Sequence, residues 1–254
     1  MKKTILTQNK LLIAFIISVV SFSFSYAQSE SIEVSPFSEV IISPHIEAVF
    51  KQSVKESVVI ERSKVDREKI NVEIEKKTLH IYLNDAKVAT KEEEVVIDGM
   101  ERDRPIYNGT EVSIIVYYKN LEEVEIRSEE VINFEDAINT QDFDLDIYGS
   151  PKVYFESITA EKLKVAIYGE SYLEIKNGTV YFQLYRCYGE SKINALEFQS
   201  TETKIAAYGD NHIVVNVSDK LKVSAFGEAV IQYKGNAKVN SGLKIGETVV
   251  QKID

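Results

Sequence analysis

The sequence predicts an all-β solenoid, in which short strands stack coil upon coil around one apolar core. Two features support this prediction: a dipeptide that returns at a fixed interval, and apolar residues that alternate with polar ones inside each repeat. Tyr-Gly occurs with a period of twenty residues, at 148–149, 168–169, 188–189 and 208–209, and Phe226-Gly227 follows after eighteen. Self-similarity of this length without a helical pattern indicates units that bury their apolar faces only against copies of themselves.

The alternation inside each repeat gives two short strands, one on either side of the glycine. Successive strand residues point to opposite faces, so residues of one parity share the interior. The expected interior residues are Leu145, Ile147, Val153, Phe155, Val165, Ile167, Leu173, Ile175, Tyr185, Cys187, Ile193, Ala195, Ile205, Ala207, Ile213, Val215, Val223, Ala225, Ile231 and Tyr233. The glycine marks a corner where a positive φ or a close backbone approach excludes a β-carbon.

One more coil is expected at each end of the regular repeats. Upstream, Val124 and Ile126 precede Ser128 at the same offsets, with serine in place of the glycine. Downstream, Gly246 opens an imperfect coil in which Lys244 falls on an interior position, so we expect this end to depart from the pattern as a cap. Coils rise by about 4.8 Å each, so six or seven of them make a rod roughly 30 Å long.

The N-terminus reads as a secretory signal peptide over residues 1–27. Lys2 and Lys3 precede an apolar stretch from Leu11 to Val20, and small residues flank the cleavage site after Ala27. No later apolar run is long enough to span a membrane, so we expect export to the periplasm, the outer-membrane surface or the medium. The mature chain keeps 27 basic against 40 acidic residues, a formal charge of −13. That charge opposes binding to nucleic acid.

The mature chain, residues 28–254, is expected to form a single β-solenoid domain, because no Pro- or Gly-rich linker divides it. Residues 28–120 contain strand-like segments at irregular spacing, which we expect to form less regular N-terminal coils. A charged excursion over residues 84–109 interrupts them. Loops of this kind are either functional or disordered, and disorder or simple solvation is the favoured interpretation here. Residues 121–250 form the regular coils.

The chain resembles the putative auto-transporter adhesin head GIN domain family of Bacteroidetes, a domain of unknown function. The resemblance rests on the signal peptide, the opening segment 37–40, the strand segments 79–81 and 112–116, and the glycine-centred β repeats. Members typically carry Gly-Ser-Gly at the corner, where this chain has Tyr-Gly-Glu-Ser or Tyr-Gly-Asp-Asn. The resemblance implies a right-handed parallel β-helix (β-solenoid) at the cell envelope, and it implies no catalytic residues.

No constellation of catalytic residues or metal ligands is visible in the sequence, and no cofactor is expected. His45, His80 and His212 lie far apart, and His212 follows a corner at an outward position typical of a surface histidine. Cys187 is the only cysteine and falls on an interior position, which favours a buried, inert thiol.

Stacking converts the repeat into two surface columns. The first is acidic and consists of Glu170, Glu190, Asp210 and Glu228. It could hold a cation such as Ca²⁺, but the favoured interpretation is that these side chains splay into water. The second column is aromatic and consists of Tyr148, Tyr168, Tyr188, Tyr208 and Phe226. It could bind sugar rings or a partner strand, whereas the favoured interpretation is a ladder whose rings pack on one another.

The expected function is a non-catalytic, adhesin-like interaction protein that recognises a glycan or an envelope protein. One alternative is a polysaccharide-active enzyme, since parallel β-helices also host such activities. The other is a structural periplasmic scaffold. The sequence leaves the ligand, the exact compartment and the oligomeric state open.

Overall fold

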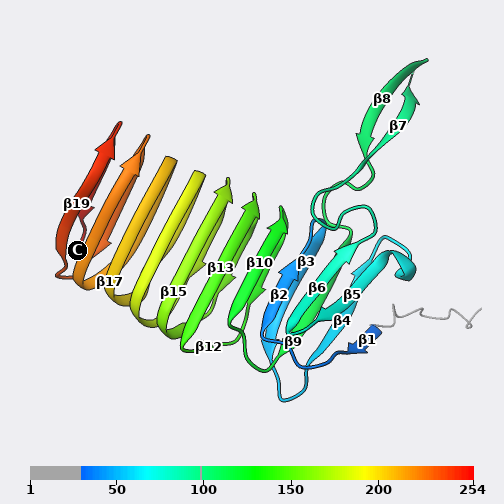
Figure 1. The fold of residues 1–254 in the computed structure, drawn as a ribbon, viewed down its shortest axis with the longest axis horizontal. Helices are drawn as coiled ribbons and strands as arrows, with labels where there is room; N and C mark the ends of the chain where they lie inside the picture. Colours follow the sequence, from blue (N-terminus) through cyan, green and yellow to red (C-terminus); the bar gives the residue numbers. More distant parts are fainter. Residues whose placement is uncertain (1–29, 98) are drawn as a thin grey trace, which may run out of the picture.

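A computed structural model describes residues 30–97 and 99–254, so the expected signal peptide lies outside the described residues. The described chain is almost entirely β-structure, with one short 3₁₀ helix, η1 (Arg67–Lys69). Stacked strands form a continuous row that ends at the C-terminal coil on one side and at an N-terminal region on the other (Figure 1). Within these residues no helix is long and apolar enough to cross a membrane.

The regular coils build three stacks of parallel strands. The first face contains β10 (Glu123–Ser128), β13 (Asp142–Gly149), the second half of β15 (Ile158–Gly169), parts of β17 (Gly178–Phe226) and β19 (Lys238–Ile245). The second face contains β11 (Val131–Phe134), β14 (Lys152–Phe155), β16 (Tyr172–Ile175), β17, β18 (Ala229–Lys234) and β20 (Thr248–Lys252). A short third stack begins at β12 (Ile138–Asn139) and continues through the starts of β15 and β17. Tyr148 pairs with Tyr168 and Tyr168 with Tyr188, so the register confirms a β-solenoid with coils of about twenty residues.

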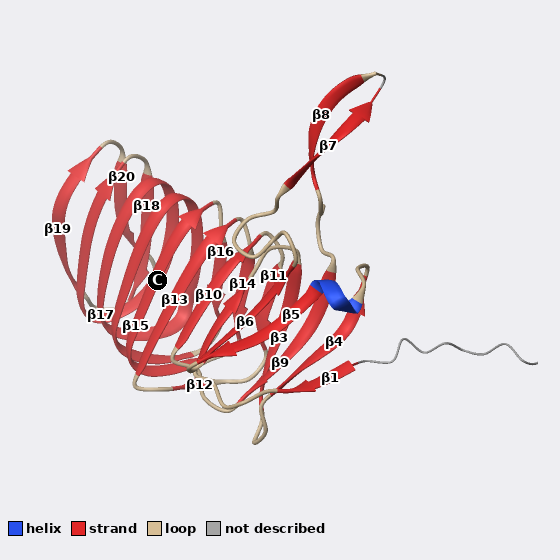
Figure 2. Cartoon of the chain, turned by 45° about the vertical axis from the view of Figure 1, so that its right-hand side comes forward, coloured by secondary structure: helices blue, strands red, loops and turns tan. Residues whose placement is uncertain are grey.

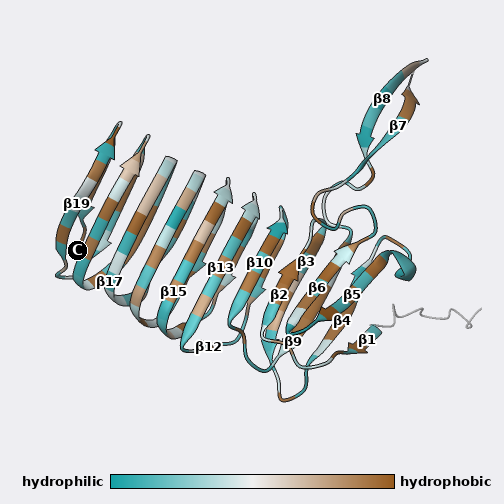
Figure 3. Ribbon diagram, in the orientation of Figure 1, coloured by the Kyte–Doolittle hydropathy of each residue, from teal (hydrophilic) through white to brown (hydrophobic). Residues whose placement is uncertain are grey.

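The core occupies the space between the three stacks. Alternate residues of each strand are apolar and buried, and the hydropathy colouring alternates in the same way (Figure 3). The expected interior residues are almost completely buried, except Tyr233, which is partly buried against the core. Inside the stack, Phe134 lies between Phe50 and Phe155, with ring centroids 4.3 and 4.1 Å away.

One core position carries a polar network that the apolar pattern does not indicate. Gln183 stacks on Leu163 and is completely buried. Its amide donates to Ser200 at 3.1 Å and to Thr203 at 2.7 Å, and it accepts a hydrogen bond from the Tyr185 hydroxyl at 3.0 Å. A buried amide is tolerated because its hydrogen-bonding groups find partners.

The corner glycines are required for two reasons. Gly169 has a φ of +135°, a conformation that side chains disfavour. A β-carbon there would also lie well inside the contact distance of the Gly149 carbonyl oxygen one coil below. Ser128 replaces glycine at the first corner, and it is not among the described non-glycine residues with positive φ, which are His45, Lys76 and Asp85.

The N-terminal region is not a simple series of coils. It comprises β1 (Glu30–Glu33), β2 (Glu39–Ile42), β3 (Ile46–Gln52), β4 (Ser57–Ser63), β5 (Ile70–Glu75), β6 (Thr78–Leu83) and β9 (Val112–Tyr118). The coil of β2 and β3 lies between β10 and β11 on one side and β6 and β9 on the other. Beyond these coils, β5 pairs with β6, β4 with β9 and β1 with β4, all antiparallel. Antiparallel pairing lets a tight turn at Lys76 reverse the chain, so that β5 lies beside β6 and ends the first face.

The charged excursion is an ordered β-hairpin rather than a structureless loop. Among the described strands, β7 (Glu92–Ile97) and β8 (Met100–Pro105) pair only with each other. The hairpin projects away from the solenoid, joined to it by two stem segments, residues 84–91 and 106–111 (Figures 1 and 2).

The C-terminal coil departs from the pattern, as the sequence suggests. A register shift lies between the pairs Val223↔Ser241 and Ala225↔Lys244, and Lys244 is exposed. Because no further described coil covers this end, Leu243 and Ile245 are 60% and 56% exposed.

Candidate functional site

The aromatic column forms a stacked ladder on the solenoid. Successive rings of Tyr148, Tyr168, Tyr188 and Tyr208 lie 4.9 to 5.0 Å apart and within 9° of parallel, and Phe226 continues the stack at 5.0 Å. The four tyrosines are 37 to 41% exposed. Each inner ring has a neighbouring ring on both faces, so its exposed surface is its edge and its hydroxyl group. Only the two terminal rings have a face that no other ladder ring covers.

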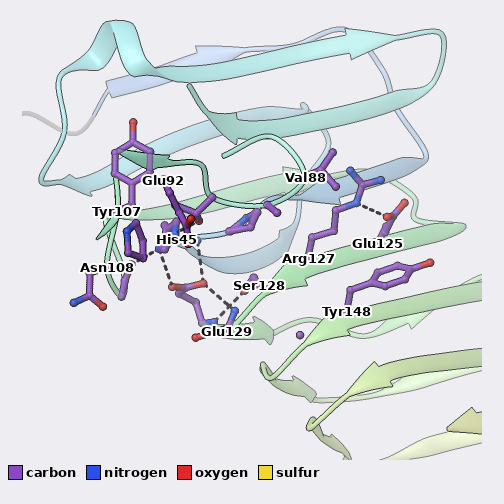
Figure 4. A pocket seen from close by; sticks show the side chains of 17 residues that line it. His45, Val88, Glu92, Tyr107, Asn108, Glu125, Arg127, Ser128, Glu129 and Tyr148 are labelled. Carbon is purple, nitrogen blue, oxygen red and sulfur yellow. Dashed lines mark hydrogen bonds and ion pairs between the residues drawn. The ribbon is translucent and has the colours of Figure 1, made fainter. Parts of the chain in front are cut away.

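Tyr148, which we call the ladder head, is bordered on its outer side by an ion pair instead of another ring. Arg127 on β10 occupies the position beside Tyr148 on β13. The Arg127 Nε donates to the Glu125 carboxylate at 2.5 Å, and both side chains lie next to Tyr148 (Figure 4). The outer side of Tyr148 therefore faces charged, hydrogen-bonding groups.

Tyr148 and Arg127 form part of a cleft of about 720 Å³, which we call the junction cleft. Four segments line it: the loop after β2, the hairpin stem, the β10 corner and the ladder head. The lining residues are Pro44, His45, Val88, Ala89, Thr90, Glu92, Pro105, Tyr107, Asn108, Gly109, Glu125, Arg127, Ser128, Glu129, Glu130, Tyr148 and Gly149. The cleft therefore lies where the N-terminal region meets the first regular coils.

His45 and Glu130 hold the walls of the junction cleft together. The His45 Nδ1 donates to the Gly109 carbonyl oxygen at 2.7 Å, and its Nε2 lies 2.5 Å from the Thr90 hydroxyl, so this ring joins both stem segments. The buried Glu130 carboxylate accepts the backbone N–H groups of His45 and Glu129, each at 3.1 Å. These contacts position the hairpin stem against the solenoid corner.

Carboxylates crowd the first face beside the cleft. Burial raises the pKa of Asp146, and the charges of Glu125 and Asp144 raise it further. Burial also raises the pKa of Glu123 and of the Tyr148 hydroxyl. The shifts of the two carboxyls reflect the crowding of Glu123, Glu125, Asp144 and Asp146 on the first two regular coils.

The acidic column lies on the other side of the corner. Glu170, Glu190 and Asp210 line a groove of about 630 Å³ on the second face, whereas Glu228 is outside its lining. Lys152 and Lys192 line the same groove. Across residues 30–97 and 99–254 no group of three or more His, Cys, Asp or Glu side chains is arranged to hold a metal ion. The prediction for the column remains that its side chains splay into water, with cation binding as the disfavoured alternative.

The surroundings of two further histidines and of the single cysteine indicate no catalytic or metal-binding role. His212 is exposed and lies 3.2 Å from the Gln232 side-chain oxygen. His80 lies 2.9 Å from the Ser43 hydroxyl, and burial lowers its pKa. Cys187 is buried, which raises the pKa of its thiol to about 12 and disfavours the reactive thiolate.

The repeat pattern and the local motifs of the sequence do not indicate the junction cleft. Its residues come from segments more than sixty positions apart, such as His45 and Gly109. No local motif marks them, because their proximity depends on the out-of-order strands of the N-terminal region. The ladder head was among the residues predicted, since Tyr148 belongs to the repeat.

Comparison with known proteins places the fold. The family model described as "Putative auto-transporter adhesin, head GIN domain" matches residues 36–237. A crystal structure of a putative adhesin from Bacteroides fragilis is similar with a TM-score of 0.75 at 18% identity, covering 89% of this chain and 96% of that one. A putative adhesin from Parabacteroides distasonis has a TM-score of 0.64 at 20% identity over the same shares of the two chains.

A third similar structure bears a different description. It is a putative lipid binding protein from Parabacteroides distasonis, with a TM-score of 0.61 at 17% identity, and it covers 89% of this chain and 96% of that one. No curated protein matches this chain. At these identities the likeness of the structures shows the fold alone, whereas the family match spans most of the sequence. The chain belongs to the putative auto-transporter adhesin, head GIN domain family.

Proposed function

We propose that this protein is an exported, non-catalytic, adhesin-like recognition protein that binds a glycan in the junction cleft. The adhesin descriptions of its family and of two similar structures support the general role. The cleft supports the location of the binding site, because it is concave and combines an aromatic ring with a few polar side chains.

The observation that carries the proposal is the position of Tyr148. It is the one ladder tyrosine with a face that no other ring covers, and it lines the cleft. A sugar ring stacks its apolar C–H face on an aromatic ring and directs its hydroxyls to charged partners. Arg127 and Glu125 supply a donor and an acceptor beside the ring. The inner tyrosines contribute hydroxyl edges, so we place the main aromatic contact at Tyr148.

A glycan array probed with the mature protein tests this proposal. We expect binding to a restricted set of glycans, and at least a tenfold weaker Kd for the best one after Tyr148→Ala or Arg127→Ala. The matched control is Tyr181→Ala, because Tyr181 is 55% exposed but lies outside both the ladder and the cleft. Thermal melting shows whether each variant is folded. Equal glycan binding by Tyr148→Ala and Tyr181→Ala would contradict the proposed site.

Incubation with a substrate separates recognition from catalysis. Mature protein mixed with polygalacturonate and Ca²⁺ is expected to release no unsaturated products, as followed by ultraviolet absorbance. Sustained turnover would replace the recognition proposal with the polysaccharide-active alternative.

A further inference from the structure

The first face of the solenoid carries a row of cations beside the ladder. Four successive coils contribute one each: Lys164, Arg186, Lys204 and Lys222, which we call the cationic strip. Lys164 lies four residues before Tyr168, whereas Arg186 lies two residues before Tyr188 and is therefore closer to the ladder, with Leu184 opposite Lys164 in the register. Lys204 and Lys222 each lie four residues before a stacked ladder ring. We propose that the cationic strip binds a linear anionic polysaccharide that lies along the solenoid axis.

The cations of the strip are poorly neutralised. Lys164 pairs with Asp144 at 2.6 Å, at the end of the strip nearest the acidic coils. In the described part of the chain, Arg186, Lys204 and Lys222 have no carboxylate within 4.0 Å. The other cations of the chain are frequently paired, as Lys176 is with Glu156 and Lys220 with Glu202.

The outward residues of the four coils confirm a local excess of positive charge. On the segments 162–168, 182–188, 202–208 and 220–226, the only outward carboxylate is Glu202, and Lys220 already pairs with it at 2.6 Å. The whole chain carries a formal charge of −10. Positive charge gathered on one face of an acidic protein attracts an anion to that face specifically.

Small side chains separate the lysines of the strip from the ladder on three of its four coils. These are Ala166, Ala206 and Ser224, whereas Arg186 takes this position on the coil of Tyr188. The exposed edges and hydroxyls of the tyrosines lie on the other side of these residues. Lys164 and Arg186 also line a hollow of about 520 Å³ at the start of the strip, where Glu123, Asp144 and Asp146 line it too, so the excess of positive charge begins beyond this hollow.

The repeat favours a polymer over a small anion. Coils are spaced by about 4.8 Å, so four cations extend over roughly 14 Å, which requires a ligand with regularly repeated negative groups. The ladder favours a polysaccharide over a single-stranded nucleic acid, because the stacked rings leave no free aromatic face for a base inside the strip. Tyrosine hydroxyls and cations suit the hydroxyl and acid groups of an anionic sugar.

The strip is distinct from the junction cleft. None of its four cations lines the cleft, and Asp144 and Asp146 lie between the two surfaces. A variant of the strip therefore tests this inference without touching the proposed glycan contact at Tyr148.

Dextran sulfate and dextran provide matched probes that differ in charge, and polygalacturonate provides a carboxylate polymer. Using titration calorimetry on the mature protein, we expect binding to both polyanions, no binding to dextran, and an affinity that falls as salt is added. Lys204→Glu is expected to weaken polyanion binding at least tenfold. Lys192→Glu, an exposed lysine on the second face, is expected to leave it unchanged. Melting temperatures verify that both variants are folded.

Several outcomes would overturn the inference. These are the absence of binding to either polyanion, equal affinity for dextran, or equal losses from Lys204→Glu and Lys192→Glu. Tighter binding to single-stranded DNA or to phosphatidylglycerol vesicles than to the polyanions would assign the strip to a different class of ligand. Retained polyanion binding in Tyr148→Ala would support a separate strip even if the junction cleft bound no glycan.

Discussion

The regular coils and the N-terminal region bury their cores in different ways. In the regular coils each residue contacts its equivalent twenty positions along, so side chains of one type form columns such as the ladder. In the N-terminal region the order across the first face is β5, β6, β2 and then β10, so neighbours come from distant parts of the sequence. Repetition therefore produces long uniform surfaces, whereas the break in chain order produces a cleft with a unique set of residues.

This difference favours different ligands for the two proposed binding surfaces. A column repeats one group at a fixed spacing, which suits a polymer with its own repeat. The junction cleft combines an imidazole, carboxylates, a guanidinium and two tyrosines from separate segments, which suits a single defined group. Substitutions in either arrangement, or at the boundary between them, test this difference.

The largest effect is expected at a corner glycine. Gly169→Val should destabilise the fold by about 3 kcal/mol or more, because it combines a positive φ with a clash against the Gly149 carbonyl group. Denaturant unfolding of the mature protein measures the loss.

The control for this variant is Gly109→Ala in the hairpin stem. Gly109 also has a positive φ, but a β-carbon there would meet no atom within 4 Å. We expect a cost of about 1 kcal/mol from backbone strain alone. If the two variants lost the same stability, close stacking of the coils would not be the reason for the corner glycine.

An intermediate effect is expected inside the ladder. Tyr188→Ala removes two stacking contacts and should destabilise the fold by about 1 to 3 kcal/mol. Tyr148→Ala removes one and should cost about half as much. Unfolding curves of the two variants provide the comparison. Parental stability of Tyr188→Ala, combined with loss of ligand binding, would show that the inner rings are a binding face instead of a structural ladder.

The regular coils could be predicted from the sequence because their contacts repeat the sequence period. Positions such as Leu145 and Ile167 are buried as alternation predicts, and the corners lie at the glycines. Gln183 shows the limit of the pattern, since its burial depends on Ser200 and Thr203 supplying partners across coils. The order of the N-terminal strands and the His45 contacts are long-range and have no period, so alternation alone does not indicate them.

The smallest effect is expected at the boundary between the two regions, where Asp146 lies among Glu125 and Asp144. Burial and these charges raise its pKa, so the folded protein holds this proton more tightly than the unfolded chain does. The resulting stabilisation is complete below the ordinary aspartate pKa of about 3.9 and is lost as pH rises through the raised value. At pH 7 the ionised carboxylate therefore opposes folding.

Asp146→Asn should accordingly raise the free energy of unfolding at pH 7, by up to about 1 kcal/mol because the site is only partly buried. The gain should shrink as the pH is lowered, since the parent carboxyl then becomes protonated and equally uncharged. Urea unfolding at pH 7 and at successively lower pH follows this trend, with the exposed Asp142→Asn on the same strand as the control. A gain from Asp146→Asn that stayed constant with pH, or that Asp142→Asn matched, would mean that crowded negative charge at this boundary does not limit stability.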